Sequence, residues 1–285
     1  MRLSPRNSGF TLIEMVLVIV LLGIVAGILA PVISQNIRAY SDTKARNEMM
    51  AQGRLALGRL ERELRHAIPY SIVVTGSTLK FVTAVAGGRY LERAESPPKI
   101  ANSDCTQNSE RFYTSSTPGK LTGLCLFSAT TLPVPPTNDG DLALVIGNNS
   151  STSLYSYSDP GTWVGLSTTT SSTPLADPDY KGVIWKLTFV SAHSFNSASA
   201  YKNYQIADFT HEVRLSGSSL LWRRVNGIAD PTAGTDSILI SGVASGGLSF
   251  DTSSLASGIL KISLTLTEGG ESITMLEDIY VRNTP

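Results

Sequence analysis

Charged residues are scarce in this chain, and neither sign of charge is in excess. Only 16% of its 285 residues are charged, and the 23 basic side chains balance the 23 acidic ones. A nucleic-acid-binding domain would carry a basic surplus on one face, so nucleic acid is not an expected partner. The low charge, together with abundant Ser, Thr and Gly, is typical of an exported β-rich protein rather than a cytosolic enzyme.

Histidine is also rare, which narrows the chemistry that the chain can perform. The three histidines are His66, His193 and His211, and no His-x-x-x-His spacing suggests a zinc site. Nucleophile-elbow and phosphate-loop patterns are absent as well. We therefore expect no enzyme activity, no metal and no cofactor, with His66 closing a helix and His211 at the start of a strand.

Two short acidic stretches come nearest to a cation-binding pattern. Residues 138–141 read Asn-Asp-Gly-Asp, and residues 177–179 read Asp-Pro-Asp. Both are shorter than a calcium-binding loop and contain residues that favour turns. We interpret them as turns.

The two cysteines, Cys105 and Cys125, both lie in the part of the chain that we place outside the cytoplasm. An even pair in an oxidising compartment predicts a disulfide, and two separate thiols are the alternative. The bond would close a short loop and stabilise the fold by roughly 3 kcal/mol.

The first 33 residues carry the clearest functional signal. Residues 1–9 are short, polar and basic, and an apolar run follows from Phe10 to Ile33. Glu14 is the one ionisable side chain in that run. The uncharged residues 15–33 approach the length of about 20 residues that a membrane-spanning helix needs.

Two common explanations of such a segment leave part of it unexplained. A secretory signal peptide cut after Ala30 would have Ile28 two positions before the cut and Pro31 directly after it, and both disfavour cleavage. A plain membrane anchor accounts for Arg2 and Arg6 on the cytoplasmic side. It gives no reason for Glu14, because a charge in a spanning helix costs roughly 2.5–3.5 kcal/mol and usually marks function.

The string Gly-Phe-Thr-Leu-Ile-Glu at residues 9–14 resembles the class III leader junction of type IV prepilins, and the likeness continues to Ala26. The resemblance implies that a membrane aspartyl peptidase cuts between Gly9 and Phe10 and methylates the new amino terminus. It also implies that Glu14, about one helical turn away, pairs with the terminal amine of a neighbouring subunit. Glu14 would then set the register between subunits.

Other features of the apolar run fit this resemblance. Pro31 stands where pilin helices commonly carry a proline, and a proline inside a helix kinks or locally melts it. Gly23 and Gly27 form a small-xxx-small pair that lets helices approach closely.

Residues 34–68 continue as an amphipathic helix. Leu57, Leu60, Leu64 and Ile68 are spaced 3, 4 and 4, which marks one buried face. The helix is expected to end before Pro69.

The rest of the chain, residues 69–285, is predicted to be a β-rich head. Short strands are expected at residues 78–85, 121–127, 142–146, 183–189 and 260–267. Hairpins are expected at the turns 216–219 and 268–271. Residues 148–174 are rich in Ser and Thr and predict a surface excursion.

Together these segments predict an α+β fold. A leader (1–9) precedes a transmembrane or filament-core helix (10–33), an amphipathic helix (34–68) and an extracytoplasmic head (69–285) with two sheets packed around the spine. Residues 41–48 and 53–69 look most like a minor pilin of the mannose-sensitive haemagglutinin pilus, and the head is more distantly similar to J-type pseudopilins of type II secretion.

The resemblance implies a minor pilin that acts in pilus assembly near the filament tip. Its expected partners are other minor and major pilins, the prepilin peptidase and methyltransferase, and the inner membrane, from which it enters the pilus or pseudopilus. Three alternatives stay open: a type II secretion pseudopilin, a tip adhesin that binds a carbohydrate or surface, and an envelope enzyme on a single anchor.

Overall fold

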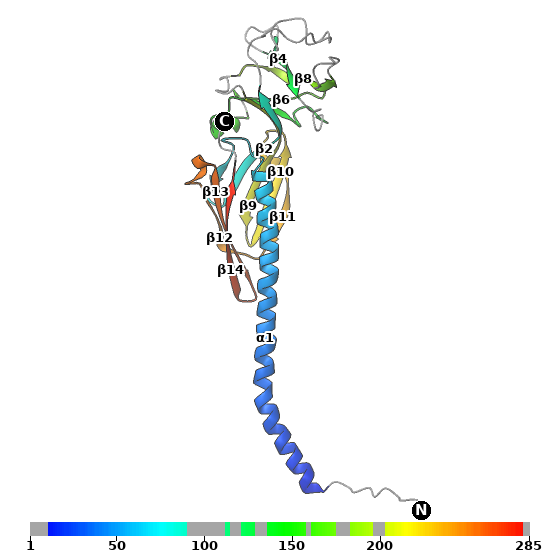
Figure 1. The fold of residues 1–285 in the computed structure, drawn as a ribbon, viewed down its shortest axis with the longest axis vertical. Coiled ribbons are helices and arrows are strands. Elements are labelled where there is room, and N and C mark those ends of the chain that lie inside the picture. The colour runs from blue at the N-terminus through cyan, green and yellow to red at the C-terminus, as the bar shows by residue number, and fades with distance from the viewer. Residues whose placement is uncertain are drawn as a thin grey trace, which may run out of the picture.

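The structure is a computed structural model that describes residues 11–89, 112–114, 121–128, 136–157, 161–174, 183–195 and 203–281. A long helix, α1 (Leu12–Leu64), carries a β-rich head on its second half, which makes this an α+β fold. The first half of α1 extends alone below the head (Figure 1). At 1.5 Å per residue, its 53 residues span about 80 Å.

The end of α1 lies earlier than the sequence suggested. The helix ends at Leu64, whereas Pro69 placed the limit at Ile68. Ala67 instead forms a β-bridge to Thr83, and the Ile68 N–H donates to the Val82 carbonyl at 2.8 Å. The backbone N–H of Ile68 therefore bonds to a strand and is not free to continue the helix.

The largest sheet of the head is antiparallel and has seven strands. Its main path runs in the order β1-β2-β9-β10-β11, while β5 also pairs with β9 and β6 pairs with β5. The strands are β1 (Val73–Thr75), β2 (Thr78–Arg89), β5 (Ala143–Ile146), β6 (Trp163–Gly165), β9 (Asn203–Ser216), β10 (Ser219–Asn226) and β11 (Thr235–Ser241). The predicted hairpin between β9 and β10 is confirmed, with Gly217 and Ser218 in its turn.

A second, three-stranded antiparallel sheet also packs against α1, through β13 and β14. It has the order β12-β13-β14, with β12 (Val243–Asp251), β13 (Ile259–Glu268) and β14 (Glu271–Tyr280). The predicted hairpin at Glu268–Glu271 is confirmed as the β13–β14 connection, and Gly269 and Gly270 both have positive φ there. Two-residue hairpin turns require such angles, which glycine adopts at little cost.

A third, four-stranded sheet in the order β3-β4-β8-β7 lies at the far end of the head (Figure 1). The sequence predicted two of its strands but not a separate sheet. Its strands are β3 (Phe112–Thr114), β4 (Leu121–Ser128), β7 (Ser171–Pro174) and β8 (Val183–His193). The short helices are α2 (Ser151–Leu154), η1 (Pro231–Ala233) and η2 (Leu255–Ser257).

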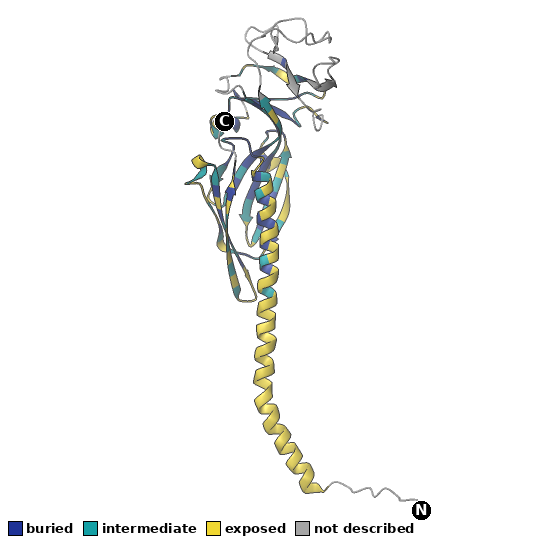
Figure 2. Ribbon diagram, in the orientation of Figure 1, coloured by how far each residue is buried: buried dark blue, intermediate teal, exposed yellow. Residues whose placement is uncertain are grey.

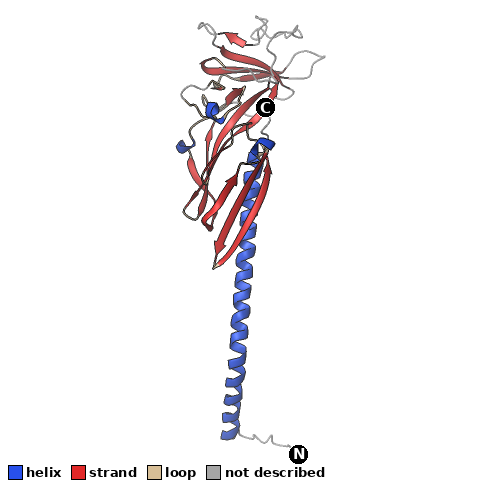
Figure 3. Cartoon of the chain, turned by 90° about the vertical axis from the view of Figure 1, so that its left-hand side faces the viewer, coloured by secondary structure: helices blue, strands red, loops and turns tan. Residues whose placement is uncertain are grey.

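The main core lies where α1 meets the first two sheets, beside the upper half of the helix (Figure 3). The predicted helical stripe is buried here, with Leu57, Leu60 and Leu64 at most 4% exposed. Phe81 and Trp222 contribute from the seven-stranded sheet to the same cluster. Burying a large apolar side chain stabilises a fold by roughly 1.5–3 kcal/mol, so this stripe fixes the head on the spine.

The predicted surface excursion at residues 148–174 is wrong in part. Leu154, Val164 and Leu166 are at most 3% exposed, and Thr162 is buried as well. Strand β6 within this segment pairs with β5. The prediction followed the Ser- and Thr-rich composition and gave no weight to the few apolar side chains in the segment. These side chains complete the cores on both faces of the large sheet.

Candidate assembly site

Thr11 and Glu14 form a capping box at the start of α1. The Thr11 N–H and Oγ1 each lie 3.2 Å from Glu14 Oε2, and the Glu14 N–H donates to Thr11 Oγ1 at 3.4 Å. This reciprocal pattern satisfies amide groups that a helix start leaves unpaired, and Glu14 adds a negative charge at the positive end of the helix dipole. The Thr-x-x-Glu spacing in the sequence is the local signal that predicts such a box.

The capping box engages one oxygen of the Glu14 carboxylate. Within the described residues, Glu14 Oε1 makes no hydrogen bond and the side chain is exposed. The carboxylate can therefore cap the start of α1 through Oε2 and still accept a hydrogen bond through Oε1 from a donor outside the chain. Gly9 and Phe10, the predicted cleavage and methylation residues, lie outside the described residues.

The helix around Glu14 is apolar on every side. All residues from 11 to 44 are exposed, as the uniformly yellow lower helix in Figure 2 shows. An 18-residue window of α1 has a mean hydropathy of 3.1, and none of it is buried within the chain, so the helix is long and apolar enough to cross a membrane. Such a surface must be covered by lipid or by other apolar helices.

The three residues expected to shape this helix, Gly23, Gly27 and Pro31, are all exposed. Pro31 lies inside α1 without interrupting it, and α1 bends in its first half (Figure 1). A Cβ added at Gly23 or Gly27 would meet nothing within 4 Å. The kink at Pro31 and the close approach of helices at the glycines stay predictions about the assembled state.

Two contacts fix the β13–β14 hairpin against α1. A Cβ added at Gly53 would lie 1.7 Å from Met275 Cε, so the missing side chain of Gly53 makes room for Met275. Nearer the membrane half of the helix, Arg46 Nε donates to Glu271 Oε2 at 2.7 Å. Together they fix where the hairpin lies along the helix.

A buried polar network on β2, β9 and β10 supports the same core. Trp222 Nε1 donates to His211 Nδ1 at 3.1 Å, which makes His211 Nε2 the protonated nitrogen facing Thr83 Oγ1, also at 3.1 Å. Thr83 in turn donates to Asp208 Oδ1 at 2.6 Å. His211 is 2% exposed and lies inside β9 rather than at a strand start.

Burial lowers the pKa of His211 to about 3, and the positive charges of Arg224 and Arg59 act in the same direction. The imidazole is therefore neutral, and its hydrogen bonds are satisfied within the sheet. This is the environment of a structural histidine, because a catalytic base would need an accessible nitrogen and a pKa nearer the working pH.

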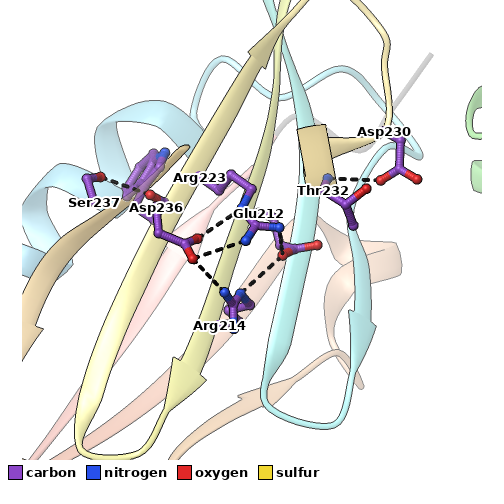
Figure 4. Close-up of polar contacts among 8 residues, drawn as sticks. Glu212, Arg214, Arg223, Asp230, Thr232, Asp236 and Ser237 are labelled. Atoms are coloured by element: carbon purple, nitrogen blue, oxygen red, sulfur yellow. Dashed lines mark hydrogen bonds and ion pairs between the residues drawn. The ribbon is translucent and has the colours of Figure 1, made fainter. Parts of the chain in front are cut away.

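A second polar network lies on the outer face of the large sheet (Figure 4). Arg223 binds both oxygens of Asp236, at 2.9 and 3.0 Å, and Arg214 binds Asp236 Oδ2 at 2.7 Å. The hydrogen bond from Arg223 is the largest influence on the Asp236 carboxyl and lowers its pKa. Asp236 lies on the edge strand β11, so the two arginines hold that edge to β9 and β10.

The first acidic stretch forms the predicted turn. Asp141 Oδ2 accepts the Asn138 N–H at 2.8 Å, and Asp139 Oδ1 accepts the Thr168 N–H at 2.8 Å, so both carboxylates serve the fold. No three His, Cys, Asp or Glu side chains converge on a metal position in the described parts of the chain. Residues 177–179 and Cys105 fall outside those parts, and the side chain of Cys125 does as well, so the disulfide stays a prediction.

Residues 4–30 match the prokaryotic N-terminal methylation motif. No curated protein and no solved structure matches the chain. The motif supports a type IV pilin or pseudopilin that is anchored in the membrane, and it implies processing by a prepilin peptidase and assembly with other pilins.

Proposed function

We propose that this protein is a minor type IV pilin that acts in pilus assembly near the filament tip. The observation that carries the proposal is the methylation motif at residues 4–30, which leads directly into an exposed apolar helix. The stretches at residues 41–48 and 53–69 point more narrowly to a subunit similar to MshO of the mannose-sensitive haemagglutinin pilus. The size of the head favours a minor subunit, because three sheets on one spine are difficult to repeat along a close-packed fibre.

In this proposal, the first step of maturation is cleavage after Gly9 on the cytoplasmic side of the inner membrane. Cleavage exposes a cationic amine on Phe10, which is then methylated. The capping box leaves Glu14 Oε1 open, so the carboxylate accepts the amine of a neighbouring subunit while Oε2 keeps the helix start closed. Two opposite charges that meet in the membrane cost far less than either one alone, which selects one stagger of adjacent helices.

Substitution of Glu14 tests this role. Glu14→Ala should be cut normally, because the scissile bond lies upstream of it, but it should enter filaments poorly because the neighbouring amine loses its partner. The measurement compares the variant's abundance in sheared filaments with its abundance in the membrane.

Two variants serve as controls for this experiment. Thr11→Val removes the hydroxyl of the capping box and keeps the Glu14 carboxylate, so it should lower incorporation less than Glu14→Ala does. Gly9→Val should leave an uncut precursor that stays in the membrane. Unchanged incorporation of Glu14→Ala would rule out the register role.

A further inference from the structure

We infer that the free edge of β14 docks an edge strand from a neighbouring pilin subunit in the same filament. This inference rests on the proposed function, because the filament supplies the neighbour. It assigns a head-to-head contact in addition to the packing of the apolar helices.

The hydrogen-bonding pattern of β14 leaves half of its backbone groups unpaired. The two-residue turn makes Glu268 and Glu271 a hydrogen-bonded pair, and the register continues without a shift to Ile259 and Tyr280. Every second residue from Glu271 therefore bonds to β13. The residues between them direct their N–H and C=O groups away from the sheet, and no described residue bonds to those groups: Ser272, Thr274, Leu276, Asp278 and Tyr280.

The same alternation exposes the side chains of this outward set. Leu276 is 77% exposed and Tyr280 is 66% exposed. Proteins usually protect a long edge strand with charged side chains, above all lysine, or with proline or a bulge. Over its ten residues β14 has no lysine, proline or bulge, and Asp278 is the single charge in its outward set. The edge strand β11 of the seven-stranded sheet differs from β14 because it is bulged, since its pairing with β10 has a register shift at Leu220/Leu221.

The exposed groups specify the chemistry of the partner. Unpaired N–H and C=O groups at every second residue match another extended strand, which supplies the same groups at the same repeat. Asp278 lies between Leu276 and Tyr280 and forms no ion pair within the described residues, although Lys261 is opposite it on β13. The partner strand should therefore place apolar side chains beside Leu276 and Tyr280 and a basic side chain beside Asp278.

The spine determines where this edge meets its neighbour. The hairpin tip points toward the membrane half of α1 (Figure 1), and the contacts at Gly53 and Arg46 fix its position along the helix. In a filament all spines run in parallel, so β14 of every copy of this fold ascends away from the membrane. A descending edge strand on the adjacent subunit pairs with it in the antiparallel sense.

Two substitutions on β14 and one matched control test the inference in cells that assemble filaments. Leu276→Lys puts a charge on the proposed edge, and Thr274→Pro removes one outward N–H without breaking the β13 ladder. Ile238→Lys makes the same change as Leu276→Lys on β11, where Ile238 is 66% exposed. The measurement is each variant's abundance in sheared filaments. Urea unfolding of each purified full-length protein checks beforehand that the substitution leaves the fold stable.

We expect both β14 variants to be processed at Phe10, to unfold at the wild-type midpoint, and to enter filaments less than the wild type does. For Thr274→Pro the loss should be at least about fivefold, the factor that corresponds to losing one hydrogen bond of about 1 kcal/mol. Leu276→Lys keeps its backbone groups and should lower incorporation because it replaces an apolar contact with a charge. Ile238→Lys should enter normally. If Thr274→Pro unfolds early, Leu276→Lys carries the test alone. Normal incorporation of Leu276→Lys, or an equal loss with Ile238→Lys, would overturn the inference.

A photo-crosslinking residue at position 276 identifies the occupant of the edge. The inference expects a crosslinked peptide from an edge strand of another pilin subunit, and a crosslink to lipid or to a protein without the methylation motif would refute it. Failure of the proposed function looks different, because the wild-type protein would then lack a processed amino terminus and would be absent from filaments.

Discussion

At the residue scale, His211 shows how the head buries a polar ring by giving each of its nitrogens a partner. Its imidazole accepts from Trp222, faces Thr83 and stacks on Phe81 with 4.8 Å between ring centroids. A buried ring that has partners for both nitrogens avoids the cost of an orphaned polar group. The same burial makes its protonation expensive.

This environment predicts an acid-dependent loss of stability. The folded pKa of about 3 lies below the ordinary value of 6.5, so the unfolded chain binds more protons between these limits. The free energy of unfolding should therefore fall as the pH drops from about 6.5 toward 3, by at most about 1.4 kcal/mol for each pH unit from this group. Urea unfolding of the full-length protein in detergent across that range measures the slope.

The comparison variant for this prediction is His211→Gln. Its side-chain amide can accept from Trp222 and donate to Thr83, but it does not titrate. The variant should show a shallower pH dependence than the wild type over the same range. Identical slopes for the two proteins would show that His211 does not control acid stability.

The sequence could indicate some residues at this scale and not others. Glu14 was predictable because a charge in an apolar run violates a local rule. The places of Gly53 and His211 depend on Met275 and Thr83, which are distant in the sequence. No local pattern contains such a contact.

At the scale of elements, the packing of α1 against the β13–β14 hairpin can be tested with two glycines of the same helix. Gly58→Ala should stabilise the protein by about 0.5–1 kcal/mol, because the position is exposed and nothing lies within 4 Å of the added Cβ. Gly53→Ala has the same helix propensity but pushes against Met275, and overpacking typically costs 1–3 kcal/mol. It should give no gain or a net loss in urea unfolding.

The control is internal to this pair, because both substitutions add one methyl group to α1. Equal stabilisation by the two would mean that Met275 moves aside freely. The hairpin would then be fixed to the helix less firmly than its contacts indicate.

Local patterns predicted most elements but not all of their limits. Alternating strands and glycine turns were identified correctly because each signal lies within ten residues, as in β13 and its hairpin. The end of α1 was placed too late, because the pairing of Ala67 with Thr83 is a tertiary contact. The segment at residues 148–174 was misinterpreted because its Ser and Thr content outweighed Leu154, Val164 and Leu166.

At the scale of the whole molecule, the chain divides its tasks between an exposed spine and a packed head. The two sheets beside α1 were foreseen by resemblance, whereas the third sheet was not, since strand order depends on pairings such as that of β4 with β8. Half of α1 is apolar and uncovered within the chain, so the molecule completes its packing only in lipid or among other subunits.

The most direct test of this account is the mass of the amino-terminal peptide from protein purified out of its native cells. The account predicts a mature chain that begins at Phe10 and carries a methyl group on its α-amine. An intact Met1, or a mature terminus well downstream of Phe10, would contradict it.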